Sequence, residues 1–433
     1  MGCRWVFPDP VFGPTVFSGK ELDLIRTAEF TRLQDIRQLS TAYLFYPAAN
    51  HSRFEHSLGV ARLVRDFAIN ILDETPRVIS LLVYAGLLHD IGHPAWSHAG
   101  ELFMKYRGVD IDHAMLSSGL VEGDPQLTQY FSGYNLPLVS EVLSKDERSL
   151  VSKLVNGKAP INTTGKNQAE VEREEKDTRY LGQIINSRAL DFDRLEYLTR
   201  DAFYTATSSS FFKLKDVFEN LKIEKTIDAT ELVFGNKDFA ESFVLTRELA
   251  YSGLYQNTEN LISKEMLARA FDLCFDASVD PHVIWFKPDQ ELLAQMSSND
   301  KSNAIIRYLR NRQIYEVMYN NNFLGLPNQA IAKLKSLAKP QILDVEKELA
   351  GSDLKPSQIL ICIAISREPV EKLSWVSTPN GPEPLYRISP LIHGMDTNYS
   401  DSRSRVVFAV DPRLDSTKKQ NMLRMFKSYF SIP

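Results

Sequence analysis

The N-terminal part of the chain repeats apolar residues at helical spacing. One amphipathic helix is predicted, with His56 at its leading end. Its apolar face consists of Val60, Leu63, Val64, Phe67 and Ile71. The following segment, Val78 to Leu88, is apolar nearly all round and predicts a buried helix that runs into His89 and Asp90. These patterns predict a mainly helical body.

The pattern changes from about residue 335. Three short β-rich runs, ILICIAI, PLYRISPLI and RVVFAV, are separated by Pro, Gly and Asn, and a helical run, KKQNMLRMFKSYF, closes the chain. We therefore expect a helical domain over residues 1–330 and a small C-terminal α+β lobe over residues 331–433. Residues 156–179 are dense in charge and poor in large apolar side chains, which predicts an exposed, mobile insertion.

Composition narrows the class of protein. A chain of 433 residues with 43% apolar and 24% charged side chains is typical of a soluble globular protein. Three scattered cysteines favour a reducing cytoplasm over a disulfide framework, and no apolar run is long enough to cross a membrane. A net charge of -5 argues against nucleic acid as a partner, because such proteins neutralise phosphates with excess basic residues.

Histidines are concentrated in one region. Of eight in the chain, six lie between residues 51 and 113: His51, His56, His89, His93, His98 and His113. A lone histidine is more often a core or surface residue. Here, however, His89 and Asp90 end an apolar helix, where burying both without partners costs several kcal/mol. A divalent metal suits both groups: imidazole with carboxylate favours Mn, Fe, Zn or Ni, and Co and Mg stay open.

The run SRFEHSLGV followed by GLLHDIGHPAWSH resembles the HD superfamily of metal-dependent phosphohydrolases, in particular its deoxynucleoside triphosphate triphosphohydrolases. By motif the resemblance covers about residues 28–320, the expected catalytic core, and by layout the remainder. It implies a mainly α HD-domain phosphohydrolase fold, a nucleotide substrate and a homo-oligomer, dimer or tetramer.

The resemblance implies a metal site and a catalytic group. The expected metal ligands are His56, His89, Asp90 and Asp193, the last from a DxD-(K/R)-xx-Y-xxx-D pattern. Without the resemblance, the acidic residues near Asp193 equally fit a solvated helix face. The expected catalytic residues close to the scissile phosphate are His93, His98, Glu101 and His113. Glu101 stands where similar enzymes carry Asp.

The resemblance also implies substrate contacts. Gln38 would bind the sugar 3'-hydroxyl, Leu39 and Tyr255 would exclude a 2'-hydroxyl, and Tyr197 and Asp201 would line the sugar. The expected phosphate and further substrate contacts are Arg53, Arg194, Arg247 and Tyr251, the last replacing a histidine of the animal SAM-and-HD-domain enzyme. Without the resemblance, a surface Gln, a core Leu and core tyrosines are the plainer interpretation.

One basic helix suggests regulation. The run NAIIRYLRNRQIYEVMY predicts an amphipathic helix with a stripe of Arg307, Arg310 and Arg312. Such stripes are usually solvated. In nucleotide-regulated relatives a similar helix serves an effector site between subunits, so Arg312 is a regulatory candidate and a nucleotide effector a candidate partner.

The expected reaction is metal-dependent hydrolysis of a deoxynucleoside triphosphate to deoxynucleoside and inorganic triphosphate. The position of the broken P–O bond follows from the resemblance alone. Two alternatives stay open: an HD hydrolase for another nucleotide phosphoester, such as a monophosphate or cyclic nucleotide, and a non-catalytic nucleotide sensor. The sugar and triphosphate contacts favour the triphosphohydrolase.

Overall fold

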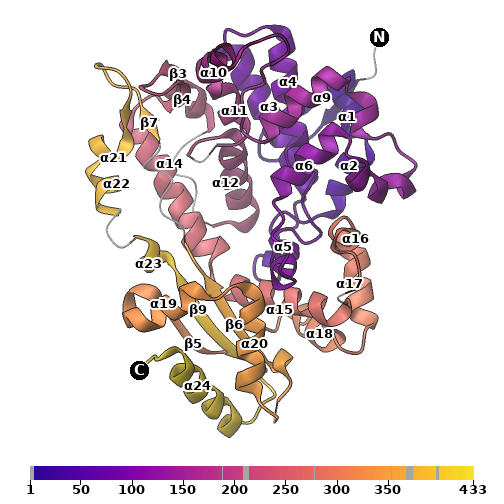
Figure 1. The fold of residues 1–433 in the computed structure, drawn as a ribbon, viewed down its shortest axis with the longest axis vertical. Coiled ribbons are helices and arrows are strands. Elements are labelled where there is room, and N and C mark those ends of the chain that lie inside the picture. The colour runs from indigo at the N-terminus through magenta and orange to yellow at the C-terminus, as the bar shows by residue number, and fades with distance from the viewer. Residues whose placement is uncertain are drawn as a thin grey trace.

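The computed structural model describes residues 4–187, 189–207, 214–276, 278–352, 354–366, 374–395 and 399–433. Helices dominate it, as the sequence predicts, with three small sheets. The N-terminal helices form the upper part of the view in Figure 1, and the sheet of β5 (Glu316–Asn322), β6 (Ile359–Ala364) and β9 (Arg405–Val410) lies below them. A hairpin of β1 (Arg4–Phe7) and β2 (Thr15–Ser18) opens the chain.

Two predicted helices are confirmed and pack on each other: α3 (Arg53–Ile71) and α4 (Pro76–Leu88). A capping box between Ser52 and Glu55 starts α3, and Thr75 caps α4 by accepting a hydrogen bond from the Val78 amide. The predicted apolar face of α3 is buried in the main core from Val60 to Phe67, as is most of α4, but Ile71 at the end of α3 is exposed. The two helices therefore hold His56 and His89 in fixed positions.

Later helices complete the body around this pair. The principal ones are α5 (His98–Tyr106), α6 (His113–Glu122), α9 (Lys145–Val155), α11 (Arg179–Ile185), α12 (Phe192–Thr205), α14 (Lys237–Ala250), α15 (Thr258–Cys274), α17 (Asp289–Ser298) and α18 (Asn303–Arg310). Helix α12 packs against α3, and α15 packs against α5. Helix α14 continues into a π-helical turn over Tyr251–Tyr255.

The C-terminal sheet has the strand order β5-β9-β6 and is antiparallel throughout. The predicted strands ILICIAI and RVVFAV are confirmed as β6 (Ile359–Ala364) and β9 (Arg405–Val410). The closing helix is confirmed as α24 (Ser416–Phe430), and its Phe426 stacks on Phe408 of β9 with ring centroids 4.5 Å apart. Helices α19 (Asn328–Ser336) and α20 (Lys339–Ala350) adjoin α24.

Strand pairing crosses the expected domain boundary at residue 331. Strand β5 (Glu316–Asn322) lies before it and pairs with β9. A second sheet has the strand order β3 (Leu221–Lys225), β4 (Thr230–Phe234), β7 (Trp375–Val376), β8 (Glu383–Pro384). The pairing of β4 with β7 joins the body to the C-terminal region. The predicted helix around Arg312 ends earlier than expected, because α18 stops at Arg310 and the chain then turns into β5.

One expectation about secondary structure is wrong, and another segment contains a helix that was not predicted. The run PLYRISPLI is not a strand but two short helices, α21 (Leu385–Ile388) and α22 (Pro390–Met395). Within residues 156–179 the chain forms α10 (Gln168–Asp177), which has no buried side chain. A capping box between Asn167 and Glu170 stabilises α10 locally. The expected exposure of this segment is confirmed, and its mobility stays a prediction.

None of the helices in the described part of the chain combines the length and the apolar character that crossing a bilayer requires.

Candidate active site

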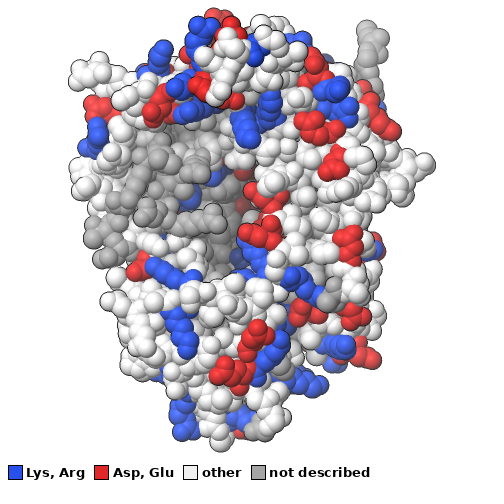
Figure 2. Space-filling model, in the orientation of Figure 1, with Lys and Arg blue, Asp and Glu red and all other residues white. Residues whose placement is uncertain are grey.

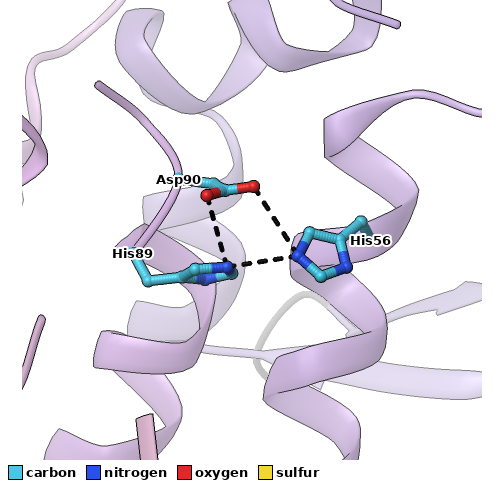
Figure 3. Close-up of side chains that lie close together, drawn as sticks. All are labelled: His56, His89 and Asp90. Atoms are coloured by element: carbon cyan, nitrogen blue, oxygen red, sulfur yellow. Dashed lines mark hydrogen bonds and ion pairs between the residues drawn. The ribbon is translucent and has the colours of Figure 1, made fainter. Parts of the chain in front are cut away.

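Four predicted metal ligands converge where α3, α4 and α12 meet. Figure 3 shows the imidazoles of His56 and His89 facing the carboxylate of Asp90. His56 Nε2 lies 3.2 Å from His89 Nε2, 3.6 Å from Asp90 Oδ2 and 3.0 Å from Asp193 Oδ1. Ligand atoms held about 2.1 Å from one ion are about 3.0–3.5 Å apart when adjacent. The spacing and the mixed imidazole and carboxylate donors therefore fit a divalent transition metal.

A second layer of groups orients the two histidines. His56 Nδ1 bonds the buried carboxylate of Glu196, and His89 Nδ1 lies 2.9 Å from the carbonyl oxygen of Gly86. Each histidine therefore presents Nε2 to the centre. Glu196 can approach α3 only because residue 59 is glycine: a Cβ at Gly59 would lie 2.0 Å from Glu196 Oε1. Arg200 pairs with Glu196 on the far side, at 2.6 Å.

The charges around His56 favour its protonated form, so a metal ion must compete with a proton for this ligand. Burial lowers the pKa of His56, but the charges of Glu196 and Asp193 outweigh burial and raise it to about 10. Burial raises the pKa of Asp90, but Arg53, which bonds it at 2.5 Å, and His89 bring it down to about 2. A metal ion that takes the place of the His56 proton releases it, so metal affinity should rise with pH.

Beside this centre, Glu101 links two histidines. Its carboxylate oxygens lie 2.9 Å from His98 Nδ1 and 2.8 Å from His113 Nδ1. His93 stacks on His113 with ring centroids 3.8 Å apart. Burial lowers the pKa of His113, but the hydrogen bond that His113 donates to Glu101 more than compensates and raises it. Burial and the charge of Arg53 hold the pKa of His93 well below its usual value. The longer side chain of Glu101 thus reaches both partners.

The loop before His98 is held in an uncommon conformation. Trp96 and Ser97 have φ values of 58° and 48°, the left-handed region that non-glycine residues seldom adopt. Asp289 of α17 fixes this loop, because its Oδ1 accepts a hydrogen bond of 2.5 Å from the Trp96 amide. The other oxygen, Oδ2, accepts from the Arg37 amide at 2.9 Å. One buried carboxylate therefore positions the segments that carry His98 and Gln38.

A cavity of about 460 Å³ opens onto both clusters. Of the predicted site residues, it is lined by Gln38, Leu39, Arg53, Asp90, His93, His98, His113, Asp193, Arg194, Tyr197, Asp201, Tyr251 and Tyr255. Figure 2 shows the surface hollowed near the middle of this face, with acidic and basic side chains around the opening. The remainder of its lining comes from α15, from the segment between Leu254 and Lys264, and from Ala364 at the end of β6.

Two of the proposed sugar contacts, Asp201 and Tyr255, are hydrogen-bonded to each other. Asp201 Oδ2 accepts a bond of 2.6 Å from the Tyr255 hydroxyl, and Asp201 Oδ1 lies 2.7 Å from His51 Nε2. Tyr197 and Tyr255 meet edge to face with centroids 6.1 Å apart. The buried side-chain oxygen of Gln38 has no hydrogen-bond partner among the described residues. That oxygen is available to a ligand hydroxyl.

The remaining candidates are placed differently. Arg194 lines the cavity and pairs with Asp191, the N-cap of α12. Arg247 stacks over Tyr251, 4.9 Å from its ring centroid, and is not among the described residues that line the cavity. Arg312 is exposed after the end of α18, with φ at 56°, and is likewise outside that lining. The structure therefore gathers the metal, catalytic and sugar candidates but not these two arginines.

Three contributors were not predicted from the sequence: Glu196, Asp289 and Lys264. Glu196 lies three residues after Asp193, so both belong to one helix, but its partner His56 is 140 residues away in the sequence. Asp289 bonds segments about 190 and 250 residues away. No local pattern marks such long-range pairs. For Glu196, the only signal in the sequence was its position three residues after the predicted ligand Asp193.

Family models match two parts of the chain. The HD domain matches residues 53–199, and the HD associated region matches residues 222–428. The metal candidates lie inside the first match, and the second covers α14, α15 and the C-terminal sheet. Together the two models cover most of the chain.

Individual relatives agree with these matches. An uncharacterized protein of Mycoplasma genitalium is 29% identical over 60% of this chain and 57% of its own length. A protein of Dictyostelium discoideum named deoxynucleoside triphosphate triphosphohydrolase SAMHD1 homolog is 26% identical over 68% of this chain and 56% of its own. The matched part thus spans just over half of these relatives.

A crystal structure of a hypothetical protein from Aquifex aeolicus has the same fold, with a TM-score of 0.71 and 20% identity. The likeness covers 97% of this chain and 100% of that one. The two matched regions identify the family: the chain belongs to the HD-domain superfamily, and its relatives include proteins named deoxynucleoside triphosphate triphosphohydrolase.

Proposed function

We propose that the protein is a metal-dependent phosphohydrolase that cleaves deoxynucleoside triphosphates into deoxynucleoside and inorganic triphosphate. The observation that carries the proposal is one cavity in which the metal candidates Asp90 and Asp193 face the sugar candidates Gln38, Asp201 and Tyr255. A metal centre alone would suit any phosphoester. The sugar-binding groups in the same cavity favour a deoxynucleotide.

The metal would be held by His56, His89, Asp90 and Asp193, and when bound it supplies positive charge at the α-phosphate and orients a water molecule. Arg53 and Arg194 add fixed positive charge in the cavity. Arginine forks match the geometry of phosphate oxygens. The chain therefore neutralises the charge that develops during phosphoryl cleavage with groups that need little rearrangement.

Proton transfer falls to the histidines linked by Glu101. Cleavage at the α-phosphorus leaves a 5'-oxygen that must be protonated, and His98 and His113 both line the cavity. Glu101 favours the protonated form of His113. His93, whose pKa is held well below its usual value, stacks on His113. His93 is therefore neutral and does not compensate the positive charge of protonated His113.

The sugar groups provide discrimination. Tyr255 and Leu39 both line the cavity and would exclude a 2'-hydroxyl, whereas Gln38 and Asp201 would offer hydrogen-bond partners to a 3'-hydroxyl. The proposal also includes two partners: a nucleotide effector that binds near Arg312, and further copies of this chain in a homo-oligomer.

The function is tested by incubating the purified protein with each dNTP, alone and in mixtures, with Mg, Mn, Co, Fe, Ni or Zn. Chromatography should show deoxynucleoside and triphosphate in equal amounts. Release of phosphate from a deoxynucleoside monophosphate or opening of a cyclic nucleotide, with dNTPs intact, would instead support the broader phosphoesterase. Binding without turnover under every metal would support a sensor.

Replacing Glu101 with Gln should shift the pH dependence of kcat toward lower pH. The Glu101 charge raises the pKa of His113, and a proton donor loses activity as pH rises through its pKa. In Glu101→Gln the alkaline fall of kcat should therefore begin at lower pH, with a loss of about tenfold or more at neutral pH. Glu122→Gln, an exposed change on α6, should keep the wild-type profile. Identical profiles for wild type and Glu101→Gln would exclude this role.

A further inference from the structure

The end of the cavity formed by α15 carries one unpaired cation. Leu254, Leu261 and Ala364 give apolar walls there, and Lys264 lies among them. Lys264 is carried by α15, whereas the metal candidates are carried by α3, by α12 and by the end of α4. Lys264 therefore belongs to a different part of the cavity from the metal candidates.

Lys264 has hydrogen-bonding capacity to spare. Its Nζ donates 3.1 Å to the carbonyl oxygen of Tyr255, which uses one of three N–H groups. The adjacent carboxylate of Glu265 is already taken by Lys339 at 2.8 Å and by the Tyr106 hydroxyl. Within the described ranges Lys264 makes no ion pair. Burial lowers its pKa to about 8, which is the cost of a cation held without a carboxylate.

The position of Lys264 points to the nucleoside half of the substrate. Glu101, which holds the candidate proton donors for the 5'-oxygen, is among the charges that act on Lys264. Its hydrogen bond to Tyr255 places it behind the candidate sugar platform. The sugar hydroxyls already have Gln38 and Asp201 as partners under the proposed function. The group left for Lys264 to contact is the base.

Resting on that proposed function, we propose that Lys264 selects the base by donating a hydrogen bond to a ring carbonyl oxygen. Guanine O6 and thymine O4 accept such a bond, whereas adenine and cytosine carry amino groups at these positions. Those amino groups are donors and would face the lysine N–H groups. The enzyme therefore prefers the oxo bases, and dGTP and dTTP exceed dATP and dCTP in kcat/KM.

Two measurements test this. The first compares kcat/KM for the four dNTPs in wild type, Lys264→Met and the control Lys339→Met, a nearby lysine paired with Glu265 and outside the described cavity lining. Lys264→Met should lower the ratio of dGTP to dATP by about ten- to a hundredfold, the worth of a hydrogen bond from a charged donor. Lys339→Met should leave that ratio unchanged. An equal fall for all four substrates would assign Lys264 to the triphosphate or to folding and overturn the proposal.

The second measurement changes the substrate and needs only wild-type protein. Deoxyinosine triphosphate keeps O6 and lacks the 2-amino group, whereas 2-aminopurine deoxyriboside triphosphate lacks O6. The inosine substrate should be hydrolysed like dGTP, and the 2-aminopurine substrate like dATP. A 2-aminopurine substrate as good as dGTP would overturn the base assignment while leaving the proposed function intact. Absence of turnover with every dNTP would instead refute the proposed function, and the base assignment with it.

Discussion

Replacing His89 or Asp193 with Ala should abolish both bound metal and turnover. Each change removes one of four candidate ligands; His56 Nε2 lies 3.0–3.6 Å from a donor atom of each of the other three. A metal contributes several kcal/mol to stabilising charge in the transition state, so its loss should lower kcat by about a thousandfold or more. Elemental analysis of the purified variants and dNTP turnover measure the two effects.

His393→Ala is the matched control, since this histidine is exposed on α22 and is not among the described residues that line the cavity. It should keep metal and activity. Glu196→Gln should give an intermediate result, because it weakens the orientation of His56 without removing a ligand; losses of about ten- to a hundredfold in metal affinity are usual for such changes. Full metal content in both His89→Ala and Asp193→Ala would refute the assigned site.

Wild-type protein should prefer a dNTP over the matching NTP by at least about ten- to a hundredfold in kcat/KM. A ribonucleotide would bury its 2'-hydroxyl against Leu39 and Tyr255 without a partner, at a cost of about 1–3 kcal/mol before any steric term. Tyr255→Ala opens this space and should narrow the preference. Parallel kinetics with dGTP and GTP measure it.

Tyr255→Phe separates packing from hydrogen bonding. It keeps the ring and removes only the 2.6 Å bond to Asp201, so most of the preference for deoxyribose should persist. Equal kcat/KM for a dNTP and its NTP in wild type would favour the broader phosphoesterase.

Periodicity predicted the framework of the site because its helices are long and strongly amphipathic or apolar. The face from Val60 to Ile71 and the run from Val78 to Leu88 both appear as helices in the expected places. His89 and Asp90 follow from those helices and from the concentration of histidines, whereas the choice of His56 among those histidines came from the family resemblance. Asp193 needed the family pattern, since its own helix also fits a solvated acidic face.

Other parts depend on contacts that spacing cannot reveal. Arg247, Tyr251 and Tyr255 step by four, which predicts one helix face, but the π-helical turn at Tyr251–Tyr255 rotates Tyr255 relative to Arg247. Glu196 acquires its role only when α12 packs on α3 across Gly59. Helix α10 escaped prediction because a local capping box, not apolar burial, stabilises it.

The most direct test of the central claim is hydrolysis of a dNTP in water enriched in oxygen-18, with mass spectrometry of both products. Attack of water at the α-phosphorus should place one labelled oxygen in the inorganic triphosphate and none in the deoxynucleoside. A deoxynucleoside monophosphate with pyrophosphate as products, or label in the 5'-hydroxyl of the deoxynucleoside, would contradict the proposed triphosphohydrolase.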